Sequence, residues 1–268
     1  MWLSPDLPSF EKPSKEDHIS KLKSRIVGII PARWASSRFP GKPLFPLLGK
    51  PLLQHVFERA LKCAELDDLV IATDDDRITA LAQEIGAKVC RTRADHPSGT
   101  DRIAEVAHLL DSATHVINIQ GDEPLLDPDL VDTLARALRD DATLPMITAA
   151  SPITHSAHLA DPNIVKVTLT SHGDALYFSR SQIPYRRQLV PALPTYRHLG
   201  IYGYRTDFLK HFVSLPPSPL ELSEGLEQLR ALEDGTRIHV HLTQHEAIGL
   251  DSPDQVPFIE SLLSPSSS

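Results

Sequence analysis

Cationic and small side chains crowd one short stretch of the chain, 30-IPARWASSRFPGKPL-44. In order, they are Arg33, Ser36, Ser37, Arg38, Gly41 and Lys42. Small residues let backbone N–H groups approach an anion, and arginine and lysine add fixed positive charge. The patterns GxxxxGK[ST] and GxGxxG are both absent, which excludes a Walker A loop and a Rossmann fingerprint. The stretch is therefore either an anion-binding loop of another kind or a solvated basic turn.

Two aspartates stand where apolar runs break into turns, Asp122 in 120-QGDEP-124 and Asp251 in 249-GLDSP-253. Together with the oxygens of a triphosphate, two such carboxylates would form an all-oxygen Mg²⁺ site. Taken singly, each aspartate is also explained as a turn former or a helix cap. The acidic run Asp74–Asp76 is assigned to a strand exit and to the start of the next helix rather than to a metal.

Strands and helices that would position these residues alternate from residue 25 to about residue 140. RIVGII (25–30) is a β-branched apolar run typical of a strand, and apolar residues then recur at helical spacing over 52–64. Further strands are predicted at 69–73, 88–90 and 115–119, and helices at 78–86, 103–110 and 130–138. This alternation predicts an α/β fold with a mostly parallel, Rossmann-like sheet flanked by helices. Such sheets bind ligands at the carboxyl ends of their strands, where the cationic stretch begins.

The second half of the chain predicts an antiparallel strand excursion. Its strands are expected in MITAASPI, IVKVTLT, ALYFSR, YRHLGIYGYR and IHVHL. LELSEGLEQLRALE is predicted to be helical, with Gly225 as an interior residue that costs about 1 kcal/mol relative to alanine. A last helix is predicted within 253–263, delayed or kinked by Pro257. We expect a single domain over 25–264, a flexible extension at 1–24 and a frayed tail at 265–268.

The composition excludes several classes of protein. The chain has 268 residues and a formal net charge of −8, which argues against a nucleic-acid partner. Its two cysteines, Cys63 and Cys90, predict reduced core thiols rather than a disulfide framework or a zinc site. No apolar run is long enough to cross a bilayer, and the first residues lack the apolar core of a secretory signal. These features predict a cytoplasmic protein without membrane insertion.

A series of motifs resembles one known family. PAR-x-x-SSR-x-PGKPL, ATDD, TRADHPSGTDR, NIQGDEP, ALYFSR-x-x-IPY, RHLGIYGYR, PSPLE and LEQLR follow one another in this order. Over about 26–254 the chain resembles the 3-deoxy-manno-octulosonate (Kdo) cytidylyltransferases, which are sugar nucleotidyltransferases. The first motif and QGDEP alone would indicate only the broader family, whereas RHLGIYGYR with LEQLR is more specific. The resemblance implies a nucleotidyltransferase sheet, CTP and Kdo as substrates, Mg²⁺ as cofactor, and CMP-Kdo for lipopolysaccharide synthesis as product.

The resemblance also implies roles for particular residues. Arg33, Lys42, Asp122 and Asp251 would be catalytic, the two cations on the CTP phosphates and the two aspartates as Mg²⁺ ligands. The nucleotide site would further comprise Ser36, Ser37, Arg93, His96, Ser98, Gly99 and Thr100. The sugar site would comprise Arg38, Gln120, His198, Tyr202, Glu227 and Gln228. Relatives are homodimers, so the portion at about 150–235 is expected to serve both the sugar acid and dimerisation.

Other interpretations of the sequence stay open. A CMP-sialic acid synthetase, or another sugar nucleotidyltransferase, would share the cationic loop and an acid pair but not RHLGIYGYR. A catalytically dead, nucleotide-binding regulatory protein would keep the loop, although the two aspartates argue against it. The histidines of 239-HVHLTQH-245 suggest a metal at first sight. No third ligand is spaced to complete such a site, so we interpret this segment as a solvated or partner-facing strand.

Overall fold

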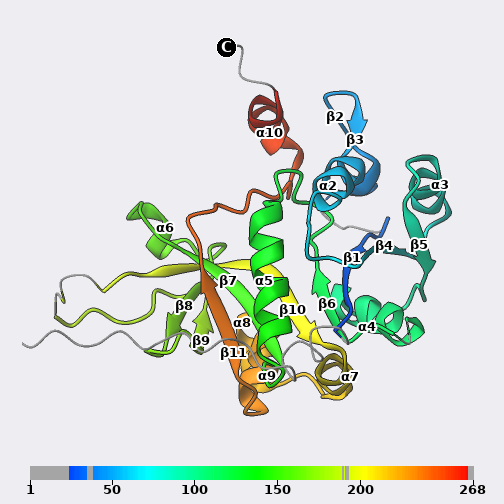
Figure 1. Cartoon of the computed structure of the whole chain (residues 1–268). Coiled ribbons are helices and arrows are strands. Elements are labelled where there is room, and N and C mark those ends of the chain that lie inside the picture. The colour runs from blue at the N-terminus through cyan, green and yellow to red at the C-terminus, as the bar shows by residue number, and fades with distance from the viewer. Residues whose placement is uncertain (1–23, 35–38, 111, 189, 191–192, 265–268) are drawn as a thin grey trace, which may run out of the picture.

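The computed structural model describes residues 24–34, 39–110, 112–188, 190 and 193–264. The predicted tail lies outside these ranges, as does the predicted extension except for Ser24. Ser36, Ser37 and Arg38 of the cationic stretch lie outside them as well. Figure 1 shows a central sheet with helices packed against it.

Within the described residues, nine strands form one sheet. In sheet order, its main path runs through β11 (Ile238–Leu242), β7 (Met146–Pro152), β10 (Tyr196–Arg205), β6 (His115–Asn118), β1 (Ile26–Pro31), β4 (Asp68–Thr73) and β5 (Lys88–Arg91). β8 (Lys166–Leu169) pairs with β10 and with β9 (Ala175–Ser179). The first-half strands pair in parallel, whereas β10 runs antiparallel to β6, β7 and β8. The predicted α/β fold with an antiparallel excursion is confirmed.

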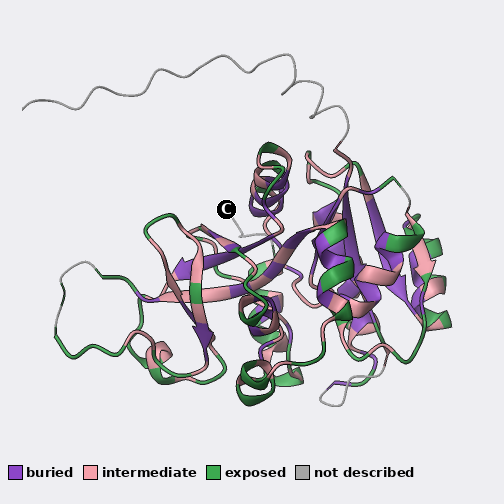
Figure 2. Cartoon of the chain, turned by 90° about the horizontal axis from the view of Figure 1, so that it is seen from below, coloured by how far each residue is buried: buried purple, intermediate pink, exposed green. Residues whose placement is uncertain are grey.

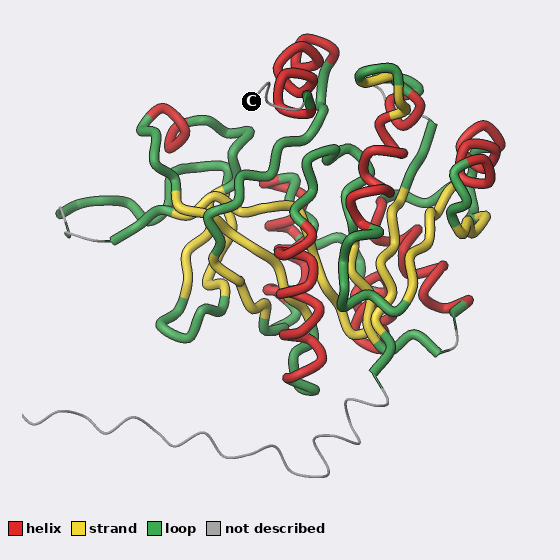
Figure 3. The backbone as a smooth tube through the Cα atoms, turned by 45° about the horizontal axis from the view of Figure 1, so that its top comes forward, coloured by secondary structure: helices red, strands yellow, loops and turns green. Residues whose placement is uncertain are grey.

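Alternate residues of β1 build two separate cores. Ile26 and Ile30 pack with α2 (Leu52–Ala60), α3 (Asp76–Glu84) and α5 (Pro128–Asp140). Val27 and Ile29 pack with α4 (Gly99–Leu109), α7 (Thr206–Ser214) and α9 (Gln228–Glu233). Successive side chains of a strand point to opposite faces, so a strand buried on both sides is apolar throughout. Figure 2 shows these central strands as buried, and Figure 3 shows helices on both sides of the sheet.

A third, smaller core joins the two ends of the described chain. It contains Phe39, Leu47, Leu52, Leu250 and Ile259. Phe39 comes from the cationic stretch before η1, and Leu47 from the short hairpin of β2 (Pro46–Leu47) and β3 (Lys50–Pro51). Leu52 begins α2, and Leu250 and Ile259 come from the segment before α10 and from α10 (Val256–Leu263) itself. Leu48 N, at the tip of the hairpin, donates a hydrogen bond of 2.9 Å to Glu260 Oε1. The C-terminal helix therefore packs against the segment that follows the cationic stretch.

Most of the predicted helix ends are confirmed. Asp127 caps α5 with Pro128 in the first turn, Asp75 caps α3, and Gly86 follows α3 with a φ of +69°. Pro257 lies in the first turn of α10, which begins only after a short 3-10 helix, η2 (Pro253–Gln255). The remaining short elements are η1 (Lys42–Leu44), α6 (Ala157–Ala160) and α8 (Pro219–Glu224).

One predicted helix is two helices. α8 ends before Gly225, which adopts the left-handed conformation with φ +63° and ψ +42°, and α9 begins at Gln228. Glycine takes this conformation without the steric penalty of a Cβ, so it ends helices rather than weakening their interior. The expectation that Gly225 destabilises one continuous helix is therefore wrong.

The sequence predicts neither a membrane-spanning helix nor a disulfide. In the part of the chain that the structure describes, no helix is long and apolar enough to cross a membrane. Cys63 and Cys90 are both free, partly buried thiols. Burial and nearby aspartates raise the pKa of the Cys63 thiol to about 12, so this cysteine carries no reactive thiolate at neutral pH.

Candidate active site

A cavity of about 280 Å³ lies at the carboxyl ends of β1 and β6. Its lining is Pro31, Ala32, Arg33, Lys42, Pro43, His96, Ser98, Gly99, Arg102, Gln120, Gly121, Asp122 and Asp251. All four residues predicted to be catalytic are therefore lining residues of one cavity. β1 and β6 are adjacent parallel strands, so the loops that leave them meet at the same edge of the sheet.

Gly121 allows these two loops to touch. A Cβ at this position would lie 2.8 Å from the carbonyl oxygen of Pro31, closer than a real Cβ approaches backbone. A glycine is needed here because the turn after β6 packs directly on the end of β1. Its neighbours Gln120 and Asp122 are thereby held beside the start of the cationic stretch.

Lys42 and Asp122 form the central ion pair of the cavity. Lys42 Nζ lies 2.5 Å from Asp122 Oδ2, and the two side chains are 16% and 30% exposed. Lys42 opens η1 directly after Gly41, whose N–H donates to the carbonyl of Trp34. The guanidinium of Arg77 lies 3.3 Å from the ring centroid of Trp34, which fixes this side of the loop.

Asp251 reaches the cavity from the far end of the sequence. Leu250 is fully buried in the third core, and its N–H donates to the Asp122 carbonyl over 2.8 Å. This bond joins the backbone before Asp251 to the backbone of Asp122. Asp251 itself is exposed and lines the cavity. The two aspartates, Lys42 and the arginines Arg33 and Arg102 therefore line one cavity.

The N-terminus of α4 forms another wall. Ser98 caps α4 by accepting hydrogen bonds from the N–H groups of Thr100 and Asp101. The single hydroxyl proton of Ser98 is shared between Asp101 Oδ2 at 2.7 Å and Glu227 Oε1 at 2.9 Å, and Thr100 Oγ1 donates to Glu227 Oε2 over 2.6 Å. Burial raises the pKa of Glu227, and the two hydroxyl bonds partly offset this effect. Glu227, which is predicted for the sugar site, thus contacts Ser98 and Thr100, which are predicted for the nucleotide site.

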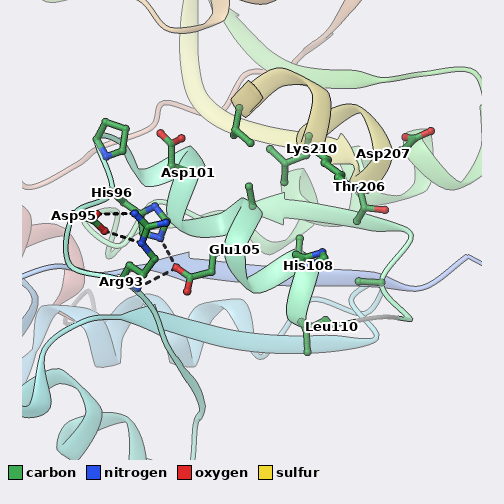
Figure 4. A pocket seen from close by; sticks show the side chains of 16 residues that line it. Arg93, Asp95, His96, Asp101, Glu105, His108, Leu110, Thr206, Asp207 and Lys210 are labelled. Atoms are coloured by element: carbon green, nitrogen blue, oxygen red, sulfur yellow. Dashed lines mark hydrogen bonds and ion pairs between the residues drawn. The ribbon is translucent and has the colours of Figure 1, made fainter. Parts of the chain in front are cut away.

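Arg93 and His96 lie at a second, larger cavity, of about 710 Å³, between α4 and α7 (Figure 4). Arg93 pairs with Asp95, with its Nη2 at 2.6 Å from Asp95 Oδ2, and the ring of His96 contacts the Glu105 carboxylate. His96 lines both cavities, whereas Arg93 lines only the larger one. The structure therefore brings His96, but not Arg93, to the cavity that holds Lys42 and Asp122.

The predicted sugar residues occupy β10, α9 and the turn after β6. Gln120 Nε2 donates to the Gly200 carbonyl over 2.6 Å, which links the cavity to β10. The ring of His198 packs 4.9 Å from Phe178 and 5.3 Å from Tyr202, measured between ring centroids. Burial lowers the pKa of His198 to about 3 and raises that of Tyr202, so both side chains are neutral near pH 7.

Hydrogen bonding fixes the tautomer of His198. Thr148 Oγ1 lies 2.7 Å from the Ile201 carbonyl, to which the hydroxyl donates, and 3.0 Å from His198 Nε2. Because the hydroxyl proton is used on the carbonyl, the imidazole donates from Nε2–H to the threonine oxygen. Nδ1 is then the deprotonated nitrogen and can accept a hydrogen bond.

Three buried side-chain polar atoms have no hydrogen-bond partner among the described residues: Asp74 Oδ1, Asn118 Oδ1 and Gln228 Nε2. Asp74 Oδ1 lies in an ion pair with Arg102, whereas Asn118 and Gln228, both 5% exposed, have no such charge beside the atom named. Buried polar groups are normally satisfied, so such atoms are candidates for contact with a bound molecule or water. Gln228 was predicted for the sugar site. Asn118, the last residue of β6, was missed, although it precedes Gln120 by only two positions.

Sequence reasoning also missed two charged residues. Arg102 is 3% exposed, lines the cavity and lies 3.0 Å from Asp74 Oδ1 through its Nη2 atom. The motif TRADHPSGTDR contains Arg102, but nothing in the motif reveals that this arginine is buried. Asp74 directly follows the last residue of β4, so its predicted place at a strand exit is confirmed.

Glu123 is the second charged residue that the sequence did not single out. Burial and the neighbouring charge of Asp122 raise the pKa of Glu123 to about 8.

The cavity gathers cationic side chains and two aspartates at the carboxyl edge of a parallel sheet, which suits a phosphate-bearing substrate. A family model described as "Cytidylyltransferase" matches residues 27–238, and the chain belongs to this family.

The relatives identify a particular branch of that family. The chain is 46% identical to a 3-deoxy-manno-octulosonate cytidylyltransferase of Syntrophotalea carbinolica, with 89% of this chain and 98% of the relative covered. It is 49% identical to the enzyme of the same name from Syntrophobacter fumaroxidans, covering 89% and 97%. A solved structure of CMP:2-keto-3-deoxy-manno-octonic acid synthetase, complexed with CTP, superposes with a TM-score of 0.86 at 44% identity, covering 90% of this chain and 98% of that one. The chain is thus a member of the 3-deoxy-manno-octulosonate cytidylyltransferase group.

Proposed function

We propose that this protein transfers CMP from CTP to the anomeric hydroxyl of Kdo and releases pyrophosphate, which activates Kdo for lipopolysaccharide synthesis. The observation that carries the proposal is the Lys42–Asp122 ion pair, which lines one cavity together with Arg33 and Asp251. A tetra-anionic triphosphate needs such cations, and the two carboxylates would hold a divalent metal that adds further positive charge. The names of the close relatives supply the two substrates.

The cations of the first loop would bind the triphosphate. Arg33 and Lys42 donate hydrogen bonds to phosphate oxygens and so neutralise charge that grows on the departing pyrophosphate. The N-terminus of α4, with Ser98 and Gly99 on the same wall, adds backbone N–H groups and the positive end of a helix. Holding both substrates in line removes much of the entropic cost of their encounter.

The sugar acid would lie on the β10 side of this cavity. His198 Nδ1 accepts from a sugar hydroxyl, and Gln228 Nε2 donates to a sugar oxygen. Because His198 is neutral at physiological pH, it cannot serve as a cationic partner for the Kdo carboxylate. The resemblance places Arg38 close to the sugar acid or to the phosphates, and we propose Arg38 for this role.

The carboxylate pair fits Mg²⁺. Among the described residues, no group of three or more histidines, cysteines and acids could hold a metal alone. Magnesium is commonly held by one or two carboxylates, with substrate phosphates and water completing its shell. The ammonium nitrogen of Lys42 at 2.5 Å from Asp122 Oδ2 marks that oxygen as a position for a cation. Asp122 and Asp251 would hold Mg²⁺, which would offset phosphate charge and lower the pKa of the attacking hydroxyl.

Pyrophosphate release from the full chain tests the proposal. We expect release only when CTP, Kdo and Mg²⁺ are all present, and little with UTP or with N-acetylneuraminic acid instead of Kdo. Asp122→Asn and Asp251→Asn should each lower turnover at least about a hundredfold, as for other groups that stabilise developing charge. Turnover with N-acetylneuraminic acid but not Kdo would favour a CMP-sialic acid synthetase. CTP binding without turnover on any sugar acid would favour a regulatory protein.

The proposal also covers the oligomeric state, the location and the partners of the protein. A homodimer would use the antiparallel excursion at about 150–235, and the reaction would take place in the cytoplasm, where CTP is available. The negative net charge and the absence of a basic surface motif in the sequence give no reason to add a nucleic-acid partner.

A further inference from the structure

The backbone of Asp251 is held by one side chain, that of Gln255. Gln255 Oε1 accepts a hydrogen bond of 2.7 Å from Asp251 N and one of 3.1 Å from Ser252 N. Ser252 is the N-cap residue of η2, and its backbone carbonyl accepts a hydrogen bond of 3.2 Å from the N–H of Gln255. A single amide oxygen therefore fixes two successive peptide groups, one of which belongs to the proposed metal ligand.

A second bond holds the same segment from the other side. Leu250 N donates to the Asp122 carbonyl over 2.8 Å, and Leu250 is fully buried. The peptide before Asp251 is thus anchored on the strand end that carries Asp122, and the peptides at and after it are anchored on Gln255. Asp251 is the exposed residue between these two anchors.

The anchor is itself supported by a packed element. Gln255 ends η2, and α10 follows at once, with Ile259 fully buried against Leu47, Leu52 and Leu250 in the third core. The hydrogen bond from Leu48 N to Glu260 Oε1 ties the same helix to the hairpin after Lys42. Gln255 therefore couples Asp251 to the core that also supports the phosphate-binding loop.

We infer that Gln255 is a positioning residue for the Asp251 carboxylate and hence for divalent metal. The inference rests on the proposed function, in which Asp251 is a metal ligand. A ligand on an exposed turn must be held in place before the metal binds, because the cost of ordering it otherwise reduces affinity. Gln255 touches neither the metal nor the substrates in this scheme and acts only through the backbone of Asp251.

The competing explanation is that Gln255 only stabilises the start of the C-terminal helical segment. Matched variants separate this structural role from the positioning of Asp251. Gln255→Ala removes the acceptor of both N–H groups, whereas Gln255→Glu keeps an oxygen at the same place. Glu260→Ala removes a structural hydrogen bond from α10 that does not reach Asp251. Binding of Mn²⁺ to the full-length protein with saturating CTP can be followed from the electron paramagnetic resonance signal of the free ion, alongside the melting temperature.

We expect Gln255→Ala to weaken Mn²⁺ binding about tenfold, the lower end for residues that orient metal ligands. Gln255→Glu should stay within about twofold of the wild type, and Glu260→Ala likewise, even where its melting temperature falls as far. Unchanged Mn²⁺ binding in Gln255→Ala would overturn the inference, and so would an equal loss of binding in Glu260→Ala. Asp251→Ala separates this failure from that of the proposed function: if it binds Mn²⁺ normally, the metal site itself is wrongly assigned.

Discussion

Lys42 and Asp122 neutralise each other across 2.5 Å, yet the proposed mechanism gives each of them a different partner. The ammonium would bind a CTP phosphate, and the carboxylate would bind Mg²⁺. Entry of the metal-bound triphosphate then exchanges one ion pair for two contacts of the same kind. Such an exchange would leave neither the ammonium nor the carboxylate without an opposite charge, which would limit the desolvation cost of binding.

Lys42→Met should therefore impair the use of CTP. We expect kcat/KM for CTP to fall about a hundredfold or more, since an electrostatic contact to the transferring group is lost. KM for Kdo should stay nearly constant. Steady-state kinetics with each substrate varied in turn will measure both values. Lys50→Met is the control, because its ammonium pairs with Glu58 at 2.6 Å instead of lining the cavity. Equal effects of the two substitutions would remove the phosphate role of Lys42.

Glu227 would connect the two proposed substrate sites through its own side chain. Its carboxylate accepts hydrogen bonds from Ser98 and Thr100, while the family resemblance places it on the sugar. Glu227→Gln replaces one acceptor oxygen by a donor and so breaks one of the two bonds. We expect KM to rise for both CTP and Kdo. Ser98→Ala should reproduce the CTP effect alone. A defect of Glu227→Gln restricted to Kdo would show that the contact with α4 has no functional role.

The break between α8 and α9 is the clearest element that the sequence pattern did not predict. Helical spacing of apolar residues continues through Gly225, so periodicity alone predicts one helix. The deciding fact is a backbone angle, φ +63°, at the residue that ends α8. The capping box of Ser218 and Glu221 fixes the other end of α8, so this six-residue helix is bounded at both ends. The break also frees Glu227 to turn toward Ser98.

Gly225→Ala should destabilise the protein by about 1 kcal/mol, because alanine is strained in the left-handed conformation. For a chain of this size, that corresponds to a fall in melting temperature of about 2–4 °C. Ser223→Ala, on the exposed side of the same helix, is the control and should change the melting temperature little. Differential scanning calorimetry will compare the two. If Gly225→Ala melts at the wild-type temperature, the left-handed angle carries no strain cost.

Local signals predicted most helix ends, because caps act within one turn of the chain. Asp127 followed by Pro128, Asp75 before α3 and Gly86 after it are each visible in the sequence. The ion pair of Arg102 with Asp74 was not visible, since it joins the exit of β4 to the first turn of α4. Contacts of this kind depend on how elements pack, and no spacing rule reports them.

At the scale of the whole molecule, the place of β10 in the sheet determines which residues lie beside the candidate active site. β10 pairs with β6 on one side and with β7 on the other, so a strand from the second half lies beside β6, which ends at Asn118 and leads into the turn that carries Asp122. The sequence predicted both the parallel alternation and the antiparallel strands, but not that β10 would insert between β6 and β7. Strand order depends on long-range pairing and burial, which periodicity cannot supply. This order explains how Gln120, which lines the cavity, comes to bond to the Gly200 carbonyl of β10.

The same pairing buries a titratable group at the other end of β6. His115 is 8% exposed and pairs with Arg205 of β10, and burial, aided by the charge of Arg205, lowers its pKa from 6.5 to about 4. Between these two values, the unfolded chain binds a proton that the folded chain does not. Stability from this group is therefore complete above pH 6.5 and is lost as the pH falls toward 4, by at most about 3 kcal/mol.

His115→Gln should remove that part of the pH dependence. We expect the free energy of unfolding, measured in urea, to fall less between pH 7.5 and 5.0 in this variant than in the wild type. His172→Gln, in an exposed turn, should keep the wild-type slope. The comparison of slopes matters more than that of absolute values, because the glutamine also changes the packing between β6 and β10 at every pH. Parallel slopes for all three proteins would mean that His115 is protonated in the folded sheet, and that the β6–β10 contact is open to water.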